Sequence, residues 1–255
     1  MNTPLVVLTA YDEEQARAFA PYVDMLLVGD SVAMVVHGAE NTLGADMEMM
    51  RSHAAQVVAG AGGSFIVVDM PYGSYEHELE LALENARSFI KLGAEAVKVE
   101  GGEERADCVS YLASHNIKVM GHIGLLPQNI EKLGGYKIQG KTEESRAKLL
   151  RDAKALEKAG AFAIVLECII EPVAAEIAQS ISIPSIGIGA SPKCSGQVLV
   201  AHDILGLTKN PPSFAKSFAD KTNNPSQAAK AFALAVREGK FPQKSHVYPD
   251  ENNEN

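Results

Sequence analysis

The chain has 255 residues, of which 46% are hydrophobic and 22% charged, an ordinary composition for a globular protein and the usual length of one (β/α)₈ barrel. Its net charge of −9 argues against a nucleic acid as the main partner, because binding a polyanion requires a basic surface. The sparse cysteines form no CxxC pair and no disulfide framework, which is typical of a protein in a reducing compartment; they are Cys108, Cys168 and Cys194.

Short apolar runs alternate with longer amphipathic stretches from the amino terminus onward. Each run has four to six residues and is rich in Val, Ile and Leu, without the polar alternation of a half-exposed strand. This pattern predicts parallel strands that are covered on both faces. The predicted strands are Leu5–Thr9, Met25–Val28, Phe65–Asp69, Ala96–Val99, Lys118–Ile123, Ala163–Glu167 and Ser185–Gly189, with an eighth and weaker pattern at Gln197–Ala201.

The stretches between these runs have helical character. Glu76–Leu92 and Glu143–Ala159 each carry an apolar stripe at helical spacing and are followed directly by a glycine. Asp12 stands three residues before Gln15, which resembles the start of a capping box. Repeated strand–helix units indicate a parallel α/β sheet with right-handed crossovers, and about eight units in this length favour a closed (β/α)₈, or TIM, barrel. An open, doubly wound sheet is the alternative.

No linker or low-complexity break interrupts this alternation, so residues 1–255 are expected to form one domain, ending in a polar tail at about 249–255. The first twelve residues lack the basic segment and long apolar run of a signal peptide. The chain also contains no apolar run of about 18 residues that would span a membrane. These features predict a cytoplasmic protein with no membrane partner.

Polar side chains gather where the predicted strands end. In a barrel these carboxyl ends meet on one face, the face on which active sites are built. One acid after one strand is weak support, whereas successive strands that end in polar residues or glycine predict a site. The side chains are Asp30 and Ser31 after the second strand, Asp69 on the third, Lys98 and Glu100 on the fourth, His122 on the fifth and Glu167 on the sixth.

Most of these residues also have a purely structural explanation. Asp30 and Asp69 are each compatible with capping a helix or a turn. Lys98 and Glu100 lie two residues apart and point to the same side of their strand, so they are compatible with an internal ion pair. His122 is compatible with a core histidine whose hydrogen bonds are satisfied. All of these explanations holding together is much less probable than any single one.

Three carboxylates on neighbouring strands predict a site for a hard cation. Asp30, Asp69 and Glu100 would repel one another without a positive charge, and no cysteine–histidine set lies nearby. Mg²⁺ fits such oxygen ligands best, and it could chelate the carboxylate and keto oxygens of a 2-oxo acid and stabilise an enolate. Lys98 and Ser31 would then hold the substrate's carboxylate.

Glu167 is the candidate base that would remove a carbon-bound proton, because a carboxylate inside an apolar run needs a reason to be there. Ile186–Ala190 (IGIGA) lacks the GxGxxG spacing and occurs late in the chain, so a tight turn is favoured over a dinucleotide site. The polar loop Leu133–Lys141 is a candidate lid or second-substrate contact, or else ordinary surface.

Long motifs along nearly the whole chain resemble those of the ketopantoate hydroxymethyltransferase family. They are LTAYD (8–12), LLVGDS (26–31), VKVEGG (97–102), GHIGLLPQ (121–128), GGYKIQG (134–140), VLECI (165–169), IGIGA (186–190), GQVLVAHDILGL (196–207) and FAKSFA (214–219).

The resemblance implies a barrel of the phosphoenolpyruvate/pyruvate superfamily. The family transfers a hydroxymethyl group from 5,10-methylenetetrahydrofolate to 3-methyl-2-oxobutanoate, giving 2-dehydropantoate and tetrahydrofolate in the first committed step of pantothenate biosynthesis. It also implies a large homo-oligomer, often a decamer.

Residue by residue, the resemblance assigns the same side chains to the same roles. Asp30, Asp69 and Glu100 would carry Mg²⁺. The 2-oxo acid would contact Asp30, Ser31, Asp69 and Lys98, with His122 lining the pocket, and Glu167 would accept the proton.

The sequence departs from the family pattern in several places. The segment before LTAYD is short, and Gly38–Asp46 replaces a VPVTLD-like loop. Ser191 stands where the family has a glycine that permits positive φ. Ser195 replaces an acid, and the loss of this acid puts a loop contact or a contact on the folate side in doubt.

Two other functions remain open from the sequence. A metal-dependent carbon–carbon lyase or mutase acting on another 2-oxo acid would share the cation site without needing folate. The second is a barrel without catalytic activity. The clustered acids disfavour this hypothesis, because they would destabilise a fold that did not use them.

Overall fold

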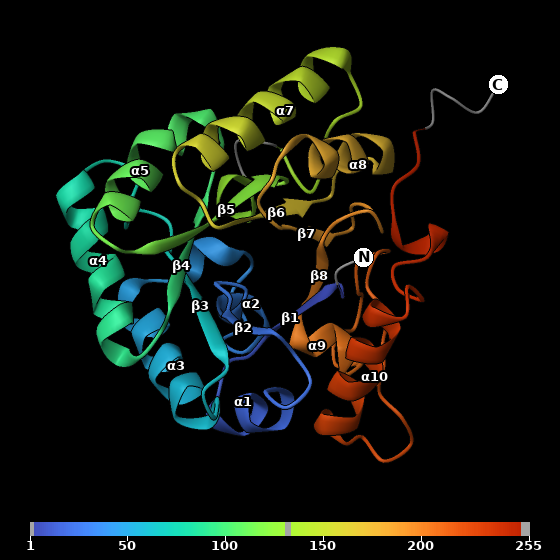
Figure 1. Ribbon diagram of the computed structural model, residues 1–255. Helices are drawn as coiled ribbons and strands as arrows, with labels where there is room; N and C mark the ends of the chain where they lie inside the picture. Colours follow the sequence, from blue (N-terminus) through green and yellow to red (C-terminus); the bar gives the residue numbers. More distant parts are fainter. Residues whose placement is uncertain (1–2, 131–133, 251–255) are drawn as a thin grey trace.

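The computed structural model describes residues 3–130 and 134–250 as a closed barrel of eight parallel strands surrounded by helices (Figure 1). The strands follow one another around the ring in chain order, and β1 closes the barrel by pairing with β8. This pairing confirms the predicted (β/α)₈ fold and excludes the open, doubly wound alternative. Within these described residues, no helix has the length and apolar character needed to cross a membrane.

The observed strands agree with the predicted ones to within a residue or two. β4 and β5 each extend one residue further than expected, and β8 starts and stops earlier because Val200 and Ala201 already belong to the next turn and helix. The strands are β1 Leu5–Thr9, β2 Met25–Val28, β3 Phe65–Asp69, β4 Ala96–Glu100, β5 Lys118–Gly124, β6 Ala163–Glu167, β7 Ser185–Ile188 and β8 Gly196–Leu199.

The longer helices form the outer layer, and short 3₁₀ turns connect several helices to the strands (Figure 1). The α-helices are α1 Glu13–Phe19, α2 Val32–Val35, α3 Met47–Gly60, α4 Leu79–Leu92, α5 Ala106–Ser114, α7 Glu143–Lys158, α8 Glu171–Ser180, α9 Ala201–Ile204 and α10 Pro225–Arg237. The 3₁₀ turns are η1 Thr42–Gly44, η2 Glu103–Arg105, η3 Pro127–Asn129 and η4 Lys244–His246.

Local hydrogen bonds explain where two helices begin. Asp12 accepts a bond from the backbone N–H of Gln15 at 2.7 Å, as the capping pattern predicts. Helix α4 begins three residues later than expected, at Leu79 rather than Glu76. The reason is that the Glu76 carboxylate accepts bonds from the backbone of Gly73 and Tyr75, which ties Glu76 into the preceding turn.

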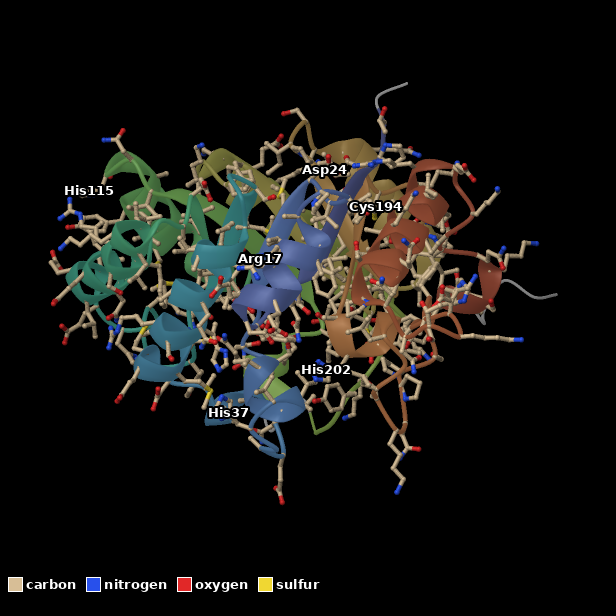
Figure 2. All side chains as sticks on the ribbon, turned by 90° about the horizontal axis from the view of Figure 1, so that it is seen from below. Arg17, Asp24, His37, His115, Cys194 and His202 are labelled. Atoms are coloured by element: carbon tan, nitrogen blue, oxygen red, sulfur yellow. The ribbon has the colours of Figure 1, made fainter. Side chains whose placement is uncertain are left out.

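The core lies inside the barrel and between the strands and helices. Fully buried rings on the helices, such as Phe19, Phe89 and Phe232, pack against the outside of the strands, while His115 lies at the outer edge of the molecule (Figure 2). Asp24, which precedes β2, links the first strand to the last helix. Its Oδ2 accepts a hydrogen bond from the backbone N–H of Val6 on β1 at 2.8 Å, and Arg237 of α10 approaches its Oδ1 at 3.3 Å. Most of the predicted polar tail, residues 251–255, lies outside the described residues.

Strand register places the predicted site residues side by side. Asp69 is the partner of Lys98 across β3 and β4, and Glu100 is the partner of His122 across β4 and β5. One strand further, Gly124 at the end of β5 faces Glu167 at the end of β6. Because the strands are parallel and in register at their carboxyl ends, residues from distant parts of the sequence meet at one mouth of the barrel.

Gly124 is a point at which the fold controls the position of Glu167. Its φ is 101°, and a Cβ added there would stand 2.2 Å from the Glu167 carbonyl oxygen. That carbonyl also accepts the N–H of Leu125 at 2.8 Å, so the two strand ends are in close backbone contact. Only glycine satisfies both the backbone angle and the close approach.

We predict that Gly124→Ala lowers the free energy of unfolding more than the control Gly63→Ala. Gly63 has a similar φ of 92° but open space around it, so alanine there costs the backbone strain alone, about 1–3 kcal/mol. Gly124→Ala adds an overpacking cost of about 1–3 kcal/mol. Urea denaturation of both variants measures the difference, and equal losses would contradict the assigned close contact.

Candidate active site

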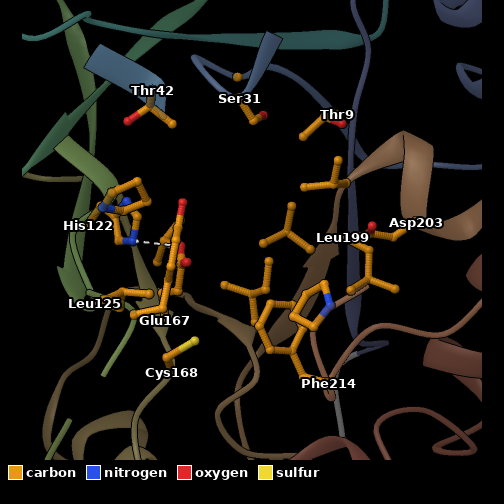
Figure 3. A pocket seen from close by; sticks show the side chains of 18 of the residues that line it. Thr9, Ser31, Thr42, His122, Leu125, Glu167, Cys168, Leu199, Asp203 and Phe214 are labelled. Atoms are coloured by element: carbon orange, nitrogen blue, oxygen red, sulfur yellow. Dashed lines mark ion pairs between the residues drawn. The ribbon is translucent and has the colours of Figure 1, made fainter. Parts of the chain in front are cut away.

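A cavity of about 500 Å³ opens at the carboxyl ends of the strands (Figure 3). Its volume and its largely apolar wall with convergent polar groups are typical of a small-molecule site. All the site residues predicted from the sequence border this cavity; they are Asp30, Ser31, Asp69, Lys98, Glu100, His122 and Glu167.

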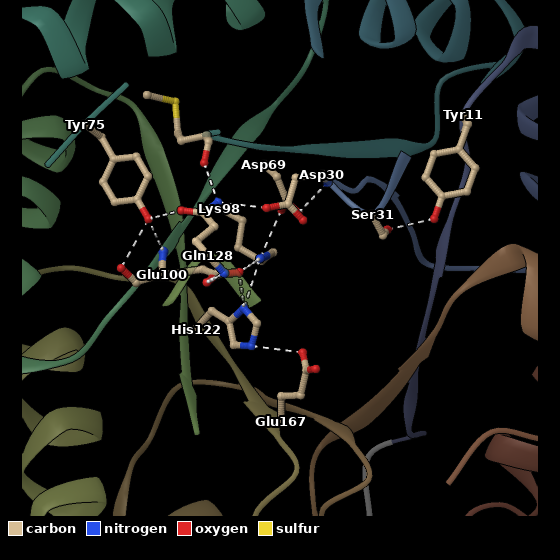
Figure 4. A network of polar contacts seen from close by, with 11 residues as sticks. Tyr11, Asp30, Ser31, Asp69, Tyr75, Lys98, Glu100, His122, Gln128 and Glu167 are labelled. Atoms are coloured by element: carbon tan, nitrogen blue, oxygen red, sulfur yellow. Dashed lines mark hydrogen bonds and ion pairs between the residues drawn. The ribbon is translucent and has the colours of Figure 1, made fainter. Parts of the chain in front are cut away.

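Asp30, Asp69 and Glu100, which we call the acidic cluster, are buried next to one another (Figure 4). The backbone N–H of Asp30 donates to Asp69 Oδ2 at 3.0 Å. Gln128 links the other two acids, because its side-chain Nε2 donates to Asp30 Oδ2 at 2.8 Å and its backbone N–H donates to Glu100 Oε2 at 3.1 Å. The three carboxylates predicted from separate strands are therefore brought together.

Lys98 supplies positive charge to the acidic cluster (Figure 4). Its Nζ lies 3.1 Å from Asp69 Oδ1 and 3.7 Å from Glu100 Oε1, and the lysine is only 4% exposed. The same atom lies 3.0 Å from Nδ1 of His122. An ammonium group can only donate, so the imidazole nitrogen accepts in this contact and carries its proton on Nε2.

His122 connects the acidic cluster to Glu167. Its Nδ1 is 3.4 Å from Glu100 Oε1, and its Nε2 is 3.1 Å from Glu167 Oε2, an ion-pair distance without the alignment of a hydrogen bond. The Glu167 side chain is 15% exposed, the most accessible of the group, and faces the cavity (Figures 3 and 4). Glu167 therefore has the partner that a carboxylate at the end of an apolar strand requires.

Burial and mutual repulsion set the pKa values of the acidic cluster. Burial, and then the charges of Asp69 and Glu100, raise the pKa of Asp30 well above its ordinary value. Burial also raises the pKa of Asp69, although Lys98 opposes it, whereas His122 and Lys98 outweigh burial and lower the pKa of Glu100.

The two basic side chains next to the acidic cluster, Lys98 and His122, also have shifted pKa values. Burial lowers the pKa of Lys98, but the charges of Asp69 and Glu100 outweigh it and the pKa is raised. Burial and Lys98 work to lower the pKa of His122, while Glu100 and Glu167 raise it to about 9. The 3.0 Å contact with Lys98 counts against a second imidazole proton, because two cations at that distance would repel, so the geometry is that of the neutral ring.

The donor atoms of the acidic cluster suit a hard cation, although they do not form a coordination shell. Asp69 Oδ1 and Glu100 Oε1 are buried without a hydrogen-bond partner, and the three carboxyl groups share one lysine, Lys98. Carboxylate oxygens of this kind are the ligands that Mg²⁺ prefers. Across residues 3–130 and 134–250, however, no three acidic, histidine or cysteine side chains are arranged around a common metal position, and Lys98 approaches both orphaned oxygens instead.

Ser31 does not have the capping role that its position suggests. It is the N-cap residue of α2, but its side chain makes no capping bond. Instead, Oγ of Ser31 lies 2.9 Å from the hydroxyl of buried Tyr11, beside the cavity (Figure 4). The hydroxyl therefore remains directed toward the cavity wall, where it can contact a bound molecule.

Sequence reasoning missed two residues that organise the acidic cluster. Tyr75 donates to Gln128 Oε1 at 2.6 Å and accepts the backbone N–H of Glu100 at 3.2 Å. Gln128 also donates to the carbonyl of Met70 at 2.9 Å, so all of its side-chain polar atoms are engaged. Gln128 closes the GHIGLLPQ motif, but an amide that follows a proline in a turn carries no chemical signal of its own.

Two of the departures noted in the sequence are accommodated by local hydrogen bonds, and a third contributes to the cavity wall. Ser191 lies outside the left-handed region, and its Oγ donates to Glu171 Oε1 at 2.9 Å. Ser195 exchanges two bonds of 3.2 Å with Ser185 at the amino-terminal ends of β7 and β8, which is the opposite face of the barrel. In the altered loop 38–46, Thr42 lines the cavity.

The candidate lid also contributes to the cavity wall. Of the predicted segment 133–141, residue 133 lies outside the described residues, while Tyr136, Lys137 and Ile138 border the cavity. Gln139 anchors the segment, since its N–H donates to the carbonyl of Cys168 at 2.8 Å.

Sequence comparison places this site among known enzymes. The sequence model of the ketopantoate hydroxymethyltransferase family matches residues 1–244. A 3-methyl-2-oxobutanoate hydroxymethyltransferase from Parvibaculum lavamentivorans is 52% identical over 246 residues, which cover 96% of this chain and 90% of that protein.

Solved structures extend the likeness to other barrels. A putative phosphonomutase from Burkholderia cenocepacia has a TM-score of 0.63 at 14% identity, covering 80% of this chain and 89% of that one. An oxaloacetate acetylhydrolase in complex with 3,3-difluorooxalacetate has a TM-score of 0.60 at 13% identity, covering 96% and 94%. At such identities the likeness concerns the fold alone.

We predict that Gln128→Met, which keeps the volume but removes the amide, lowers the free energy of unfolding by about 1–3 kcal/mol. The reason is that Asp30 Oδ2 and the Met70 carbonyl lose a buried donor. Gln56→Met, on the exposed face of α3, is the matched control, because its amide bonds only within its own helix. Denaturant titration compares the variants, and a loss at Gln128 no larger than at Gln56 would show that the amide does not support the cluster.

Proposed function

The chain belongs to the ketopantoate hydroxymethyltransferase family, and we propose that it transfers a hydroxymethyl group from 5,10-methylenetetrahydrofolate to 3-methyl-2-oxobutanoate. One water is consumed, and the products are 2-dehydropantoate and tetrahydrofolate, in the first step of pantothenate biosynthesis. The observation that carries the proposal is that Glu167 and the acidic cluster border one cavity and are joined through His122. A proton acceptor and a charged binding end are what removal of a proton next to a keto group requires.

In this proposal the acidic cluster holds Mg²⁺ through the carboxylates of Asp30, Asp69 and Glu100. When bound, the cation would polarise the keto group of the oxo acid and make the neighbouring C–H more acidic. The support is the donor chemistry, namely buried carboxylate oxygens without hydrogen-bond partners in a region of excess negative charge.

Lys98 and Ser31 bind the carboxylate of the oxo acid. The Lys98 ammonium group is buried beside the cavity, where an ionic contact is screened little by water. The Ser31 hydroxyl borders the same space and is held by Tyr11. Asp30 and Asp69 contact the bound acid from the same wall, and His122 lines the pocket between them and Glu167.

Glu167 accepts the proton from C3 of the oxo acid, after which C3 forms its bond to the one-carbon unit. Its carboxylate borders the cavity, and its Oε2 lies 3.1 Å from Nε2 of His122. Apolar residues of β6, β7 and β8 border the same cavity and would limit the access of bulk water; they are Val165, Ile188, Val198 and Leu199. On the same family basis we propose a cytoplasmic homo-oligomer, such as a decamer.

The decisive test is an assay with purified protein, Mg²⁺, 3-methyl-2-oxobutanoate and methylenetetrahydrofolate. We expect 2-dehydropantoate to form only when the folate is present. Turnover of the oxo acid without folate would support a lyase or mutase instead. Absence of both proton exchange at C3 and product would support a barrel without catalytic activity.

We predict that Glu167→Gln slows deuterium exchange at C3 of 3-methyl-2-oxobutanoate by about 10²–10⁴-fold while the oxo acid still binds, because an amide cannot accept the proton. Glu171→Gln is the matched control, since Glu171 follows the same strand but does not border the cavity. Exchange is followed by NMR. Undiminished exchange in Glu167→Gln would remove this residue from the role of base.

We also predict that Asp69→Asn weakens Mg²⁺ binding about tenfold or more, since even groups that only support metal ligands change affinity about 10–100-fold. Asp152→Asn serves as the control, because Asp152 is a buried acid that pairs with Lys148 away from the cavity. Isothermal titration with Mg²⁺ measures both variants. An isotherm equal to that of the unaltered protein would reject Asp69 as a ligand.

A further inference from the structure

Asp203 brings a carboxylate to the side of the cavity that faces His122 and Glu167 (Figure 3). It lies on α9, directly after β8, and is 6% exposed. The start of α9 is tied to the barrel, because the Ala201 N–H donates to Thr9 Oγ1 at 2.7 Å. Asp203 is thus held in place by the fold, yet the proton chemistry proposed for Glu167 does not use it.

The Asp203 carboxylate has a single side-chain donor among the described residues. Thr208 donates its hydroxyl to Asp203 Oδ1 at 2.6 Å, and within residues 3–130 and 134–250 no side-chain hydrogen bond is made to Oδ2. Burial raises the pKa of Asp203. A carboxylate in this position is best satisfied by a ligand that brings N–H donors into the cavity.

The wall next to Asp203 suits a flat ring. Phe214 borders the cavity, and its ring packs so closely on Gly189 that a Cβ there would stand 2.6 Å from Phe214 Cδ1. Leu199 (Figure 3) and Ile188 add apolar side chains to the cavity wall. An aromatic face beside an acceptor is the environment that a planar heterocycle with an N–H edge would occupy.

We propose that this side of the cavity binds the pterin ring of the one-carbon donor, with the Asp203 carboxylate accepting hydrogen bonds from the ring N3–H and the 2-amino group. The inference rests on the proposed function, which requires a reduced folate. The pterin edge presents two adjacent donors, and a carboxylate presents two adjacent acceptors, so the pair can bind in a bidentate manner.

The arrangement of the cavity agrees with this assignment. The acidic cluster and Glu167 would take the oxo acid on one side, and Asp203 with Phe214 would take the heterocycle on the other. The carbon to be transferred would then lie between them, beside the apolar residues of the cavity wall. A cavity of about 500 Å³ is larger than a small oxo acid fills, which leaves room for a second ring-sized ligand.

The competing explanation is that Asp203 only braces the turn after α9 through its bond to Thr208. Asp203→Asn separates the two roles, because an amide oxygen can still accept from Thr208 while its NH₂ group opposes the donors of the pterin. We expect the KM for methylenetetrahydrofolate to rise about tenfold or more in Asp203→Asn, with a far smaller change in the KM for 3-methyl-2-oxobutanoate. Thr208→Val, which removes the brace alone, should show neither rise.

A second measurement tests the contact between the Asp203 carboxylate and the 2-amino group of the pterin. Tetrahydrofolate and its analogue without the 2-amino group are titrated against the unaltered protein and Asp203→Asn. We expect the unaltered protein to bind the analogue more weakly, and Asp203→Asn to distinguish the two much less.

Each of three results would overturn the pterin assignment. They are an unchanged KM for methylenetetrahydrofolate in Asp203→Asn, an equal rise in the KM of both substrates, and the same rise in the folate KM in Thr208→Val. Equal binding of the two tetrahydrofolates by the unaltered protein would do the same. Failure of the unaltered protein to form folate-dependent product would instead count against the proposed function itself, so the two failures are distinguishable.

Discussion

Lys98 makes the burial of the acidic cluster possible, and the remainder of the site is arranged around that contact. Removing a carboxylate from water is costly unless a partner compensates its charge. Lys98 approaches Asp69 and Glu100, so that one ammonium group faces three buried carboxyl groups. The excess of negative charge gives the mouth of the barrel an affinity for cations, whereas a fold without such a site would gain stability by losing these acids.

Backbone geometry holds the opposite partner, Glu167, at the cavity. The next residue, Cys168, has a φ of 50°, a left-handed conformation that costs a non-glycine residue about 1–2 kcal/mol. The strand end is nevertheless secured on both sides, since the Glu167 carbonyl accepts from Leu125 and the Cys168 N–H donates to Ile188. Hydrogen bonds to both neighbouring strands thus maintain the turn that follows Glu167, whose side chain lies beside His122 of the adjacent strand.

The two halves of the barrel contribute different kinds of residue to the cavity. The first half of the ring, β2 to β5, contributes the charged residues, and the second half contributes mainly apolar strand ends with Phe214 and Asp203 beyond them. A closed ring allows this division because its first and last strands are neighbours, so that the segment after β8 returns to Thr9 on β1. An open sheet would have placed these segments at opposite edges.

The sequence by itself determined the alternation of strands and helices and the residues at the strand ends, and it favoured a closed barrel, which the pairing of β1 with β8 confirmed. These features depend on short-range patterns, namely apolar runs of strand length and polar residues directly after them. The longer motifs indicated the family. Tertiary structure alone decided that Gln128 and Tyr75 link the acids, that Lys98 lies between Asp69 and Glu100, and that Asp203 faces Glu167 across the cavity. Those relations depend on strand register and on side chains that meet across the ring, and no local pattern of residues encodes the distance between them.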